Sequence, residues 1–249
     1  MISLQNIRKV FHKGKENELT ALENLSLQIN KSEFVVLVGA NGSGKTTLLN
    51  IIGGAEKLTS GSIRINGTDV TQFPEYQRSK WIARVFQNPN NGTAPDLTIL
   101  DNFRLAALRT QRKNLTIGAD TAFKKKIVDK IATLGMGLEN KITQPMGNLS
   151  GGQRQALTLL MSIMDETDIL LLDEPTAALD PKSARVVLNL ADKFNKDFGI
   201  TTMLITHNLK DAQQYGNRLI QLQEGKILRD INTESKVQLL LPDIYEWFG

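Results

Sequence analysis

Residues 39 to 46 of the 249-residue chain read Gly-Ala-Asn-Gly-Ser-Gly-Lys-Thr and fit the pattern G-x-x-x-x-G-K-[ST] at every position. An apolar run at 34–38 precedes this segment, and apolar residues at 48, 49, 51 and 52 predict a helix after it. In a loop between a strand and a helix, glycines let backbone N–H groups approach and bind phosphates. Lys45 would reach the β- and γ-phosphates, and the hydroxyl of Thr46 would bind Mg²⁺. We expect the phosphates of a nucleotide to be bound by Gly39, Asn41, Gly42, Ser43, Gly44, Lys45, Thr46 and Thr47.

Two acidic residues, Asp173 and Glu174, follow a second apolar run at 169–172. A run that is apolar throughout indicates a strand buried on both faces of a parallel sheet, and ligands bind beyond the carboxyl ends of such strands. Asp173 would hold Mg²⁺ through water, and Glu174 would act as general base on the attacking water. The two acids could instead be solvated loop residues, but together with a phosphate loop they predict hydrolysis of a nucleotide.

The elements that would position these residues alternate between strands and helices. Apolar runs at 203–205 and 219–222 predict buried strands, and residues 186, 190 and 194 place apolar side chains on one helix face. Asp180 can cap the N-terminus of that helix, and Pro181 fits its first turn. This alternation predicts an α/β fold with a parallel sheet. Together with the phosphate-loop motif, it resembles the core of P-loop NTPases.

Two regions depart from this alternation. Residues 3–7 and 25–29 alternate apolar and polar side chains, which predicts an N-terminal antiparallel β-subdomain with a hairpin loop at 12–18. Residues from about 90 to 149 are helix-rich, with helices predicted at 99–108 and 119–134, and indicate an inserted helical subdomain. We therefore expect one domain over 1–249, with its catalytic core and β-subdomain at about 1–89 and 150–230, its helical subdomain at about 90–149, and a short tail at 231–249.

The composition excludes several classes of function. The chain has no cysteine, so disulfides, thiolate metal sites and cysteine nucleophiles are ruled out. The net charge of +4 is too small for the dense basic stripe of a nucleic-acid binder, and we expect the run at 124–126 to be a solvated helix face. We see neither a signal peptide nor an apolar run of about 20 residues, the length of a membrane span. Membrane association would therefore come through a partner.

A third motif, Leu149-Ser150-Gly151-Gly152-Gln153, lies about 20 residues before the acidic pair. Ser150 can cap a helix predicted over 153–164, and the two glycines open another helix end that binds anions. This LSGGQ string, at this distance from the acids, resembles the signature of ABC ATPases. The resemblance covers about residues 2 to 230 and implies that Ser150, Gly151, Gly152 and Gln153 bind ATP.

The same resemblance assigns roles to four more residues. Gln87 is similar to the Q-loop glutamine that contacts Mg²⁺ and the γ-phosphate and senses the transporter. Asp180, in Ala-Leu-Asp at 178–180, resembles the D-loop at the dimer interface, and His207 resembles the switch histidine that contacts the γ-phosphate. Phe11 stands where an aromatic residue stacks on adenine, although a phenylalanine in a hairpin can equally be a core residue.

The resemblance also implies partners. Two copies would form a head-to-tail dimer in which Lys45 of one subunit and Ser150 of the other face the same ATP. A membrane permease would be driven from the cytoplasmic face of the bacterial inner membrane, where the chain would be peripheral. Residues 92–95 and 157–160 are similar to a group of bacterial importer ATPases that work with a substrate-binding protein, some of them in aromatic amino acid uptake.

Two other readings stay open on the sequence. One is a soluble ABC ATPase without a permease, and the other is an exporter or lipoprotein-release ATPase, in which the loop at 12–21 has a similar appearance. Trp247 and Phe248 could cover the edge of the domain or a partner surface. We expect uptake of a small solute such as an amino acid.

Overall fold

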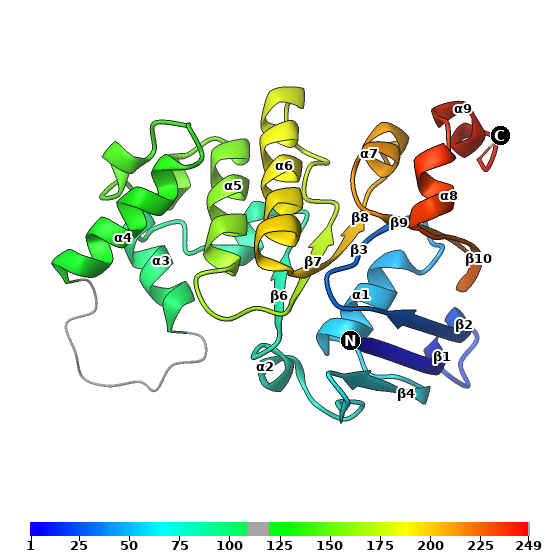
Figure 1. The fold of residues 1–249 in the computed structure, drawn as a ribbon. Helices are drawn as coiled ribbons and strands as arrows, with labels where there is room; N and C mark the ends of the chain where they lie inside the picture. The colour runs from blue at the N-terminus through cyan, green and yellow to red at the C-terminus, as the bar shows by residue number, and fades with distance from the viewer. Residues whose placement is uncertain (109–119, 249) are drawn as a thin grey trace.

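The centre of the computed structural model, which describes residues 1–108 and 120–248, is a six-stranded sheet of order β10-β9-β3-β8-β7-β6 (Figure 1). Neighbouring strands run parallel except β10, which is antiparallel to β9. The predicted buried strands are confirmed. The strands of this sheet are β3 (Phe34–Val38), β6 (Ile82–Val85), β7 (Ile169–Asp173), β8 (Thr201–Ile205), β9 (Arg218–Gln223) and β10 (Lys226–Ile231).

A second, antiparallel sheet is formed mainly by the N-terminal region and has the order β2-β1-β4-β5. The strands expected at 3–7 and 25–29 are confirmed and are longer than predicted, and the hairpin loop spans the residues between them. The four strands are β1 (Ile2–Phe11), β2 (Leu19–Ile29), β4 (Ser60–Ile65) and β5 (Thr68–Asp69). The sheet is completed by β4 and β5, which lie after the phosphate loop in the sequence.

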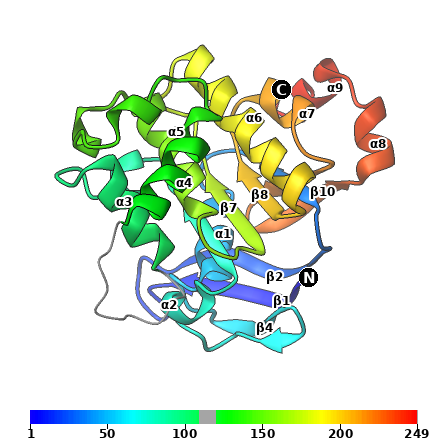
Figure 2. The same ribbon diagram turned by 60° about the vertical axis from the view of Figure 1, so that its left-hand side comes forward.

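Helix α1 (Lys45–Gly53) lies between the two sheets, as Figures 1 and 2 both show. Its residues Leu48 and Ile51 join one hydrophobic cluster with Ile2 of β1 and Leu37 of β3. The short helix α2 (Glu75–Arg78) follows β5. Since α1 begins directly after the phosphate loop, both sheets fix the position of that loop.

The opposite face of the main sheet is covered by α5 (Gly151–Ser162), α6 (Pro181–Phe198) and α7 (Leu209–Gln214). Alternate residues of β3 divide between the two faces: Val36 packs with these helices, whereas Val35 packs on the α1 side. This burial on both faces explains why the strand sequences are apolar throughout.

The described residues between β6 and α5 include the two helices expected there. They contain α3 (Ile99–Ala107), α4 (Thr121–Ala132) and the short 3₁₀ helices η1 (Pro89–Gly92), η2 (Glu139–Lys141) and η3 (Met146–Asn148). Phe103 and Ile127 are buried in the same cluster as Leu157 of α5, so this segment shares its core with the main sheet. Residues 109–119 of the predicted subdomain, including the expected helix start at 119, lie outside the described residues.

The C-terminal tail contains α8 (Thr233–Gln238) and α9 (Leu241–Tyr245). Trp247 packs against the main hydrophobic cluster and lies 5.0 Å from the guanidinium carbon of Arg229. Trp247 therefore covers an edge of the domain, whereas Phe248 is 40% exposed. Gly249, the last residue of the predicted tail, is not described.

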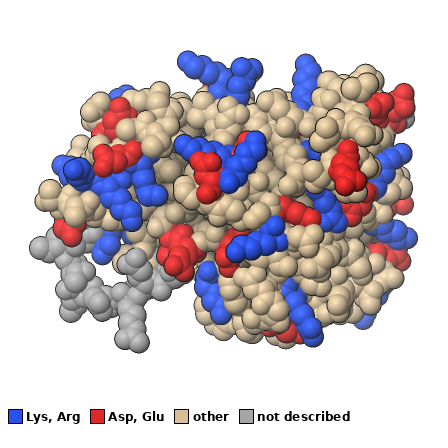
Figure 3. Space-filling model, viewed as in Figure 1, with Lys and Arg blue, Asp and Glu red and all other residues tan. Residues whose placement is uncertain are grey.

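Charged side chains of both signs share the surface drawn in Figure 3, with basic ones gathered toward the helical segment at its left. Helix α4 carries Lys124, Lys125 and Lys126, all exposed, as expected of a solvated helix face. Within the described ranges, no helix combines the length and the apolar character that a bilayer crossing requires.

Candidate nucleotide-binding site

The phosphate loop connects β3 to α1 and is closed around the side chain of Lys45. The ammonium group donates to the carbonyl oxygens of Gly39 at 2.8 Å and Ala40 at 2.9 Å. Burial lowers the pKa of Lys45, and the negative charges of Glu174 and Asp173 partly oppose that shift. A cation in this position is held ready for a polyanionic ligand.

Two glycines of the loop occupy places that no other residue fits. A Cβ on Gly39 would lie 2.3 Å from the carbonyl oxygen of Leu222, and one on Gly44 would lie 2.6 Å from that of Ala21. Gly44 also has a φ of 101°, in the left-handed region that favours glycine. The loop is therefore packed tightly against β2 and β9, and its backbone path depends on the missing side chains.

The predicted acidic pair lies beside this loop. The hydroxyl of Thr46 donates to Oδ1 of Asp173 at 3.2 Å, although 127 positions separate the two residues in the sequence. Asp173 is the last residue of β7 and pairs with Ile205 of β8. The carboxyl ends of parallel strands meet at one edge of the sheet, and this edge is where α/β folds bind ligands.

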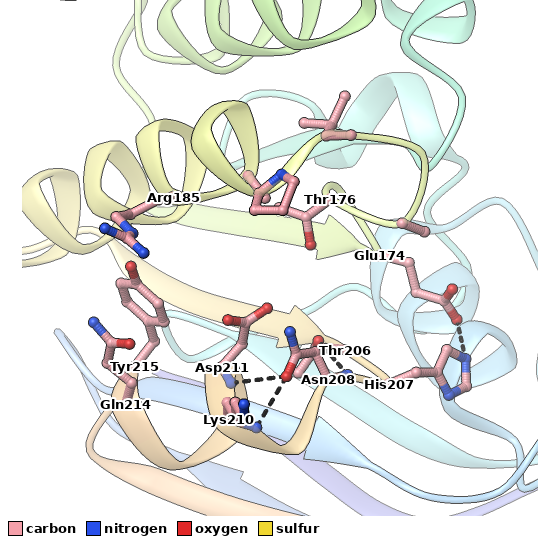
Figure 4. A pocket seen from close by; sticks show the side chains of 14 residues that line it. Glu174, Thr176, Arg185, Thr206, His207, Asn208, Lys210, Asp211, Gln214 and Tyr215 are labelled. Atoms are coloured by element: carbon pink, nitrogen blue, oxygen red, sulfur yellow. Dashed lines mark hydrogen bonds and ion pairs between the residues drawn. The ribbon is translucent and has the colours of Figure 1, made fainter.

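Glu174 and His207 face each other at the same edge (Figure 4), with 2.5 Å between Oε1 of Glu174 and Nε2 of His207. The carboxylate is largely buried, whereas the imidazole is 44% exposed. Glu174 has a φ of 49°, in the left-handed region, and its N–H donates to the carbonyl oxygen of Ile205 at 3.1 Å. Strain of this kind at a non-glycine residue is concentrated at functional sites.

Gln87 follows β6, two residues beyond the end of that strand, and is exposed. Because Val85 pairs with Leu172, Gln87 leaves the sheet next to the carboxyl end of β7. Phe11 is the last residue of β1, pairs with Leu19, and belongs to neither hydrophobic cluster of the described chain. Its ring lies 4.5 Å from the ammonium nitrogen of Lys9. The core alternative for Phe11 is thereby weakened, and its adenine contact stays a prediction.

The signature motif forms the predicted helix start, although α5 begins at Gly151 and ends at Ser162, two residues earlier than expected at each end. The hydroxyl of Ser150 accepts from the N–H of Gln153 at 3.3 Å, and the side chain of Gln153 accepts from the N–H of Ser150 at 3.2 Å. This reciprocal pair satisfies two N–H groups at the helix start. A Cβ on Gly152 would lie 2.3 Å from that of Ser183, so α5 touches the first turn of α6.

Asp180 caps α6 as predicted, accepting from the N–H groups of Lys182 and Ser183, each at 3.1 Å. A hydrogen bond from the Ser183 side chain, together with these backbone N–H groups, lowers the pKa of the Asp180 carboxyl. Ser150, Gln153 and Asp180 line one pocket of about 470 Å³ that contains no residue of the phosphate loop. Across the described ranges, no hydrogen bond or ion pair links Ser150 to Lys45. The signature motif and the phosphate loop thus lie in separate places on the single chain.

Two neighbours of the site were not predicted from the sequence. Arg84 of β6 forms an ion pair with Asp173, with 3.1 Å between Nη2 and Oδ2. Gln155, fully buried in α5, donates to the carbonyl oxygen of Phe86 at 3.0 Å and so ties the signature helix to the segment before Gln87. The signal for Arg84 was its charge in an otherwise apolar stretch, whereas Gln155 lies within an ordinary helical pattern.

A pocket of about 630 Å³ is lined by Glu174 and His207 together with side chains from α6 and α7 (Figure 4). Its lining includes Asp211, Arg185 and Tyr215. Burial raises the pKa of the Asp211 carboxyl. None of these three residues was predicted as part of a site, because they follow the regular pattern of capped surface helices.

Comparison with known proteins agrees with this geometry. The chain matches the family described as ABC transporter over residues 22–177. It is 40% identical over 250 residues to a tyrosine transport ATP-binding protein of Clostridioides difficile (strain R20291), covering 100% of this chain and 98% of the relative. It is 31% identical over 248 residues to the phosphonates import ATP-binding protein PhnC of Lactococcus lactis subsp. lactis (strain IL1403), with 98% of each covered.

Solved structures give the same result. A dimeric ATP-binding cassette in a post-hydrolysis state, bound to ADP and Pi, superposes with a TM-score of 0.81 and 31% sequence identity over 94% of this chain and 99% of that one. Dimeric cassettes of this kind support a dimer of this chain as well. With a phosphate loop, an acidic pair and a signature helix arranged on this fold, the chain belongs to the ABC transporter family and is an ATP-binding, ATP-hydrolysing transporter subunit.

Proposed function

We propose that this subunit powers the uptake of a small solute, most specifically an aromatic amino acid, through a separate membrane permease. The substrate class rests on the relative named as a tyrosine transport ATP-binding protein, which matches this chain over its whole length. The relatives named for phosphonates and methionine import also favour uptake over export. The observation that carries the energising role is the Glu174–His207 pair, 2.5 Å apart at the edge of the sheet that holds the phosphate loop.

In the hydrolysis that we propose, Lys45 binds the β- and γ-phosphates together with the N–H groups of the loop and of the start of α1. Glu174 takes a proton from the attacking water, and general bases of this kind accelerate reactions by about 10²–10⁴-fold. His207 holds Glu174 in place through its short contact and turns its exposed ring toward the γ-phosphate. Gln87 contacts the same phosphate from the end of β6.

Thr46, Gln87 and Asp173 offer the oxygen donors that Mg²⁺ prefers, and one carboxylate combined with phosphate oxygens is a common magnesium site. The hydroxyl of Thr46 lies 3.2 Å from Oδ1 of Asp173, so the two donors fit a single ion. The described residues contain no cluster of three His, Cys, Asp or Glu side chains that would hold a metal by themselves. When bound, Mg²⁺ would neutralise charge on the phosphates.

The dimer that we propose is head-to-tail, because each chain carries the phosphate loop and the signature helix in different places. Ser150, Gly151, Gly152 and Gln153 of a second copy would then cover the ATP held by Lys45, with Asp180 at the interface. Phe11 would stack on adenine from the end of β1. In this arrangement ATP joins the two copies, and its hydrolysis by Glu174 releases them, which would drive the permease between two states.

We propose a peripheral location at the cytoplasmic face of the bacterial inner membrane, reached through the permease, with a substrate-binding protein as a further partner. Uptake of labelled tyrosine, phenylalanine and tryptophan by a deletion strain tests this proposal. Complementation by the wild-type chain should restore uptake of at least one of them, whereas Glu174→Gln should not.

Each alternative predicts a different outcome of that experiment. Restored uptake of a phosphonate or methionine, with no change for aromatic amino acids, would refute the substrate class. A change in efflux alone would favour an exporter. A chain that never fractionates with membranes from cells would favour an ABC ATPase without a permease.

A further inference from the structure

Arg84 is a charged residue in an otherwise apolar part of the main sheet. Strands β3, β6, β7 and β8 together contain two charged residues, Arg84 and Asp173, and these two form an ion pair. Arg84 pairs with Leu171 in the register of β6 and β7. Since side chains alternate along a strand, Arg84 lies on the same face of the sheet as Asp173, two residues beyond Leu171, and this face carries α1.

The ion pair is largely shielded from water. The side chains of Arg84 and Asp173 are 11% and 12% exposed, and Nη2 lies 3.1 Å from Oδ2. The guanidinium carbon of Arg84 lies 4.6 Å from the ring centre of Phe86, and its buried Nε makes no hydrogen bond within the described chain. Asp173 is therefore the main electrostatic partner that this part of the structure gives to Arg84.

The two oxygens of Asp173 have different partners. Oδ1 accepts from the hydroxyl of Thr46 at 3.2 Å, while Oδ2 faces Arg84. A divalent cation bound next to Thr46 would thus share one carboxylate with a permanently charged arginine. Two cations that neutralise the same carboxylate weaken each other's binding, because each repels the other and each reduces the negative charge available to the other.

We propose that Arg84 is a positioning residue that serves as a built-in counter-ion of Asp173 and sets the Mg²⁺ concentration at which the nucleotide is bound. The proposal rests on the proposed role of Asp173 in holding Mg²⁺. Arg84 stabilises the buried carboxylate when magnesium is scarce and competes with the ion when it is abundant. Such coupling is reciprocal, and coupling energies between sites in proteins correspond to about 5–150-fold changes in affinity.

Removal of Arg84 should therefore have two opposite effects. The protein without Mg²⁺ should lose stability, because a largely buried carboxylate loses its ion-pair partner and keeps only the charge of Lys45 nearby. The site should bind Mg²⁺ more tightly, because the competing charge is gone. A merely structural role of Arg84 predicts the first effect without the second.

The test measures binding rather than turnover, in a Glu174→Gln background that suppresses hydrolysis. A fluorescent ATP analogue at fixed concentration is titrated with Mg²⁺, and thermal unfolding is followed with and without the ion. For Arg84→Met we expect the half-saturating Mg²⁺ concentration to fall at least about fivefold. We also expect the rise in Tm on adding Mg²⁺ and nucleotide to be larger than in the parent. Arg84→Gln keeps a hydrogen-bond donor without the charge, and should shift the titration in the same direction if the methionine variant does not fold.

Two controls separate the charge of Arg84 from general damage. Arg84→Lys keeps the charge and should stay within about twofold of the parent, since a coupling of about 0.4 kcal/mol corresponds to twofold. Arg218→Met removes a similarly buried arginine from its ion pairs with Glu33 and Asp230 at another part of the sheet, and should lower Tm without moving the titration. An unchanged or higher Mg²⁺ requirement in folded Arg84→Met or Arg84→Gln would overturn the proposal. If the parent binds the analogue with no dependence on Mg²⁺, the metal role of Asp173 fails as well.

Discussion

Replacement of Arg78 by methionine should destabilise the helix that carries the phosphate loop. Arg78 is 2% exposed, and its guanidinium donates to the carbonyl oxygens of Ile51 at 2.7 Å and Ile52 at 2.9 Å. These carbonyls belong to the last turn of α1, where a helix leaves C=O groups without partners of its own. The same guanidinium donates to the carbonyl oxygens of Phe73 at 2.9 Å and Thr71 at 3.3 Å. Arg78 thus joins α1 to the segment between β5 and α2.

The size of the effect follows from two opposing terms. Three of the four hydrogen bonds are short, and the loss of a hydrogen bond to a charged donor costs about 2 kcal/mol, so the gross loss is about 6 kcal/mol. Burial lowers the pKa of Arg78 to about 10, which corresponds to about 3 kcal/mol of desolvation that an uncharged side chain avoids. Arg78→Met should therefore lower the free energy of unfolding by about 3 kcal/mol.

Urea unfolding followed by circular dichroism measures this loss, and an unchanged m-value would show that the unfolded states are comparable. Arg64→Met is the control, because Arg64 is exposed on β4 opposite Asp69 and its loss should cost at most about 1 kcal/mol. Arg78→Met should also bind nucleotide more weakly than the wild type, because α1 begins with Lys45 and Thr46 of the phosphate-loop motif. If Arg78→Met were as stable as the Arg64 control at equal m-value, the capping of α1 by Arg78 would be refuted.

Three further predictions concern the site and the tail. Glu174→Gln should keep ATP binding, lower turnover by about 10²–10⁴-fold, and trap a dimer when ATP is added. Light scattering after size exclusion measures the dimer and a phosphate-release assay measures turnover, and full activity would refute the role of Glu174 as general base. Gly152→Ala should lower the ATPase activity of the dimer without weakening nucleotide binding to the monomer, because the new Cβ would lie 2.3 Å from the Cβ of Ser183. ATPase activity equal to that of the wild type would contradict the close contact of α5 with α6. Burial lowers the pKa of Lys236 to about 8. Above pH 8 the folded state therefore binds fewer protons than the unfolded state, so the free energy of unfolding should rise with pH. Between pH 8 and 9.5 the unfolding free energy of the wild type should gain roughly 2 kcal/mol over that of Lys236→Met, and a constant difference in urea titrations would exclude the buried ammonium as the cause.

The parts of the site that were predicted from the sequence are those encoded locally. The phosphate loop is recognised by the spacing of its glycines next to an apolar strand. Ser150 and Asp180 are recognised by their positions at helix starts. Even the proximity of Thr46 to Asp173 follows from the predicted strands, because each residue comes after the carboxyl end of a strand and the two strands were predicted to belong to one parallel sheet. Residue type and order along the chain were sufficient for these assignments.

Contacts that depend on register and loop path were not predictable in this way. Strand β6 has four residues and contains Arg84, so neither its length nor its apolarity marked it as a buried strand. The pairing of Arg84 with Asp173 needs the register of β6 against β7, which no local pattern specifies. Arg78 likewise reaches α1 from a four-residue helix, and its partners are backbone carbonyls, which every residue possesses.

The contact at Gly152 has a consequence for how two copies would close on ATP. Gly152 lies in the first turn of α5 and touches Ser183 in the first turn of α6, while Asp180 caps α6 and lines one pocket with Ser150. The signature helix and the Asp180 loop are thus packed as one unit. The phosphate loop is fixed separately, between β3 and α1. Each surface is thus already formed within the single chain, so the approach of two preformed surfaces would complete the site without repacking the core of either copy.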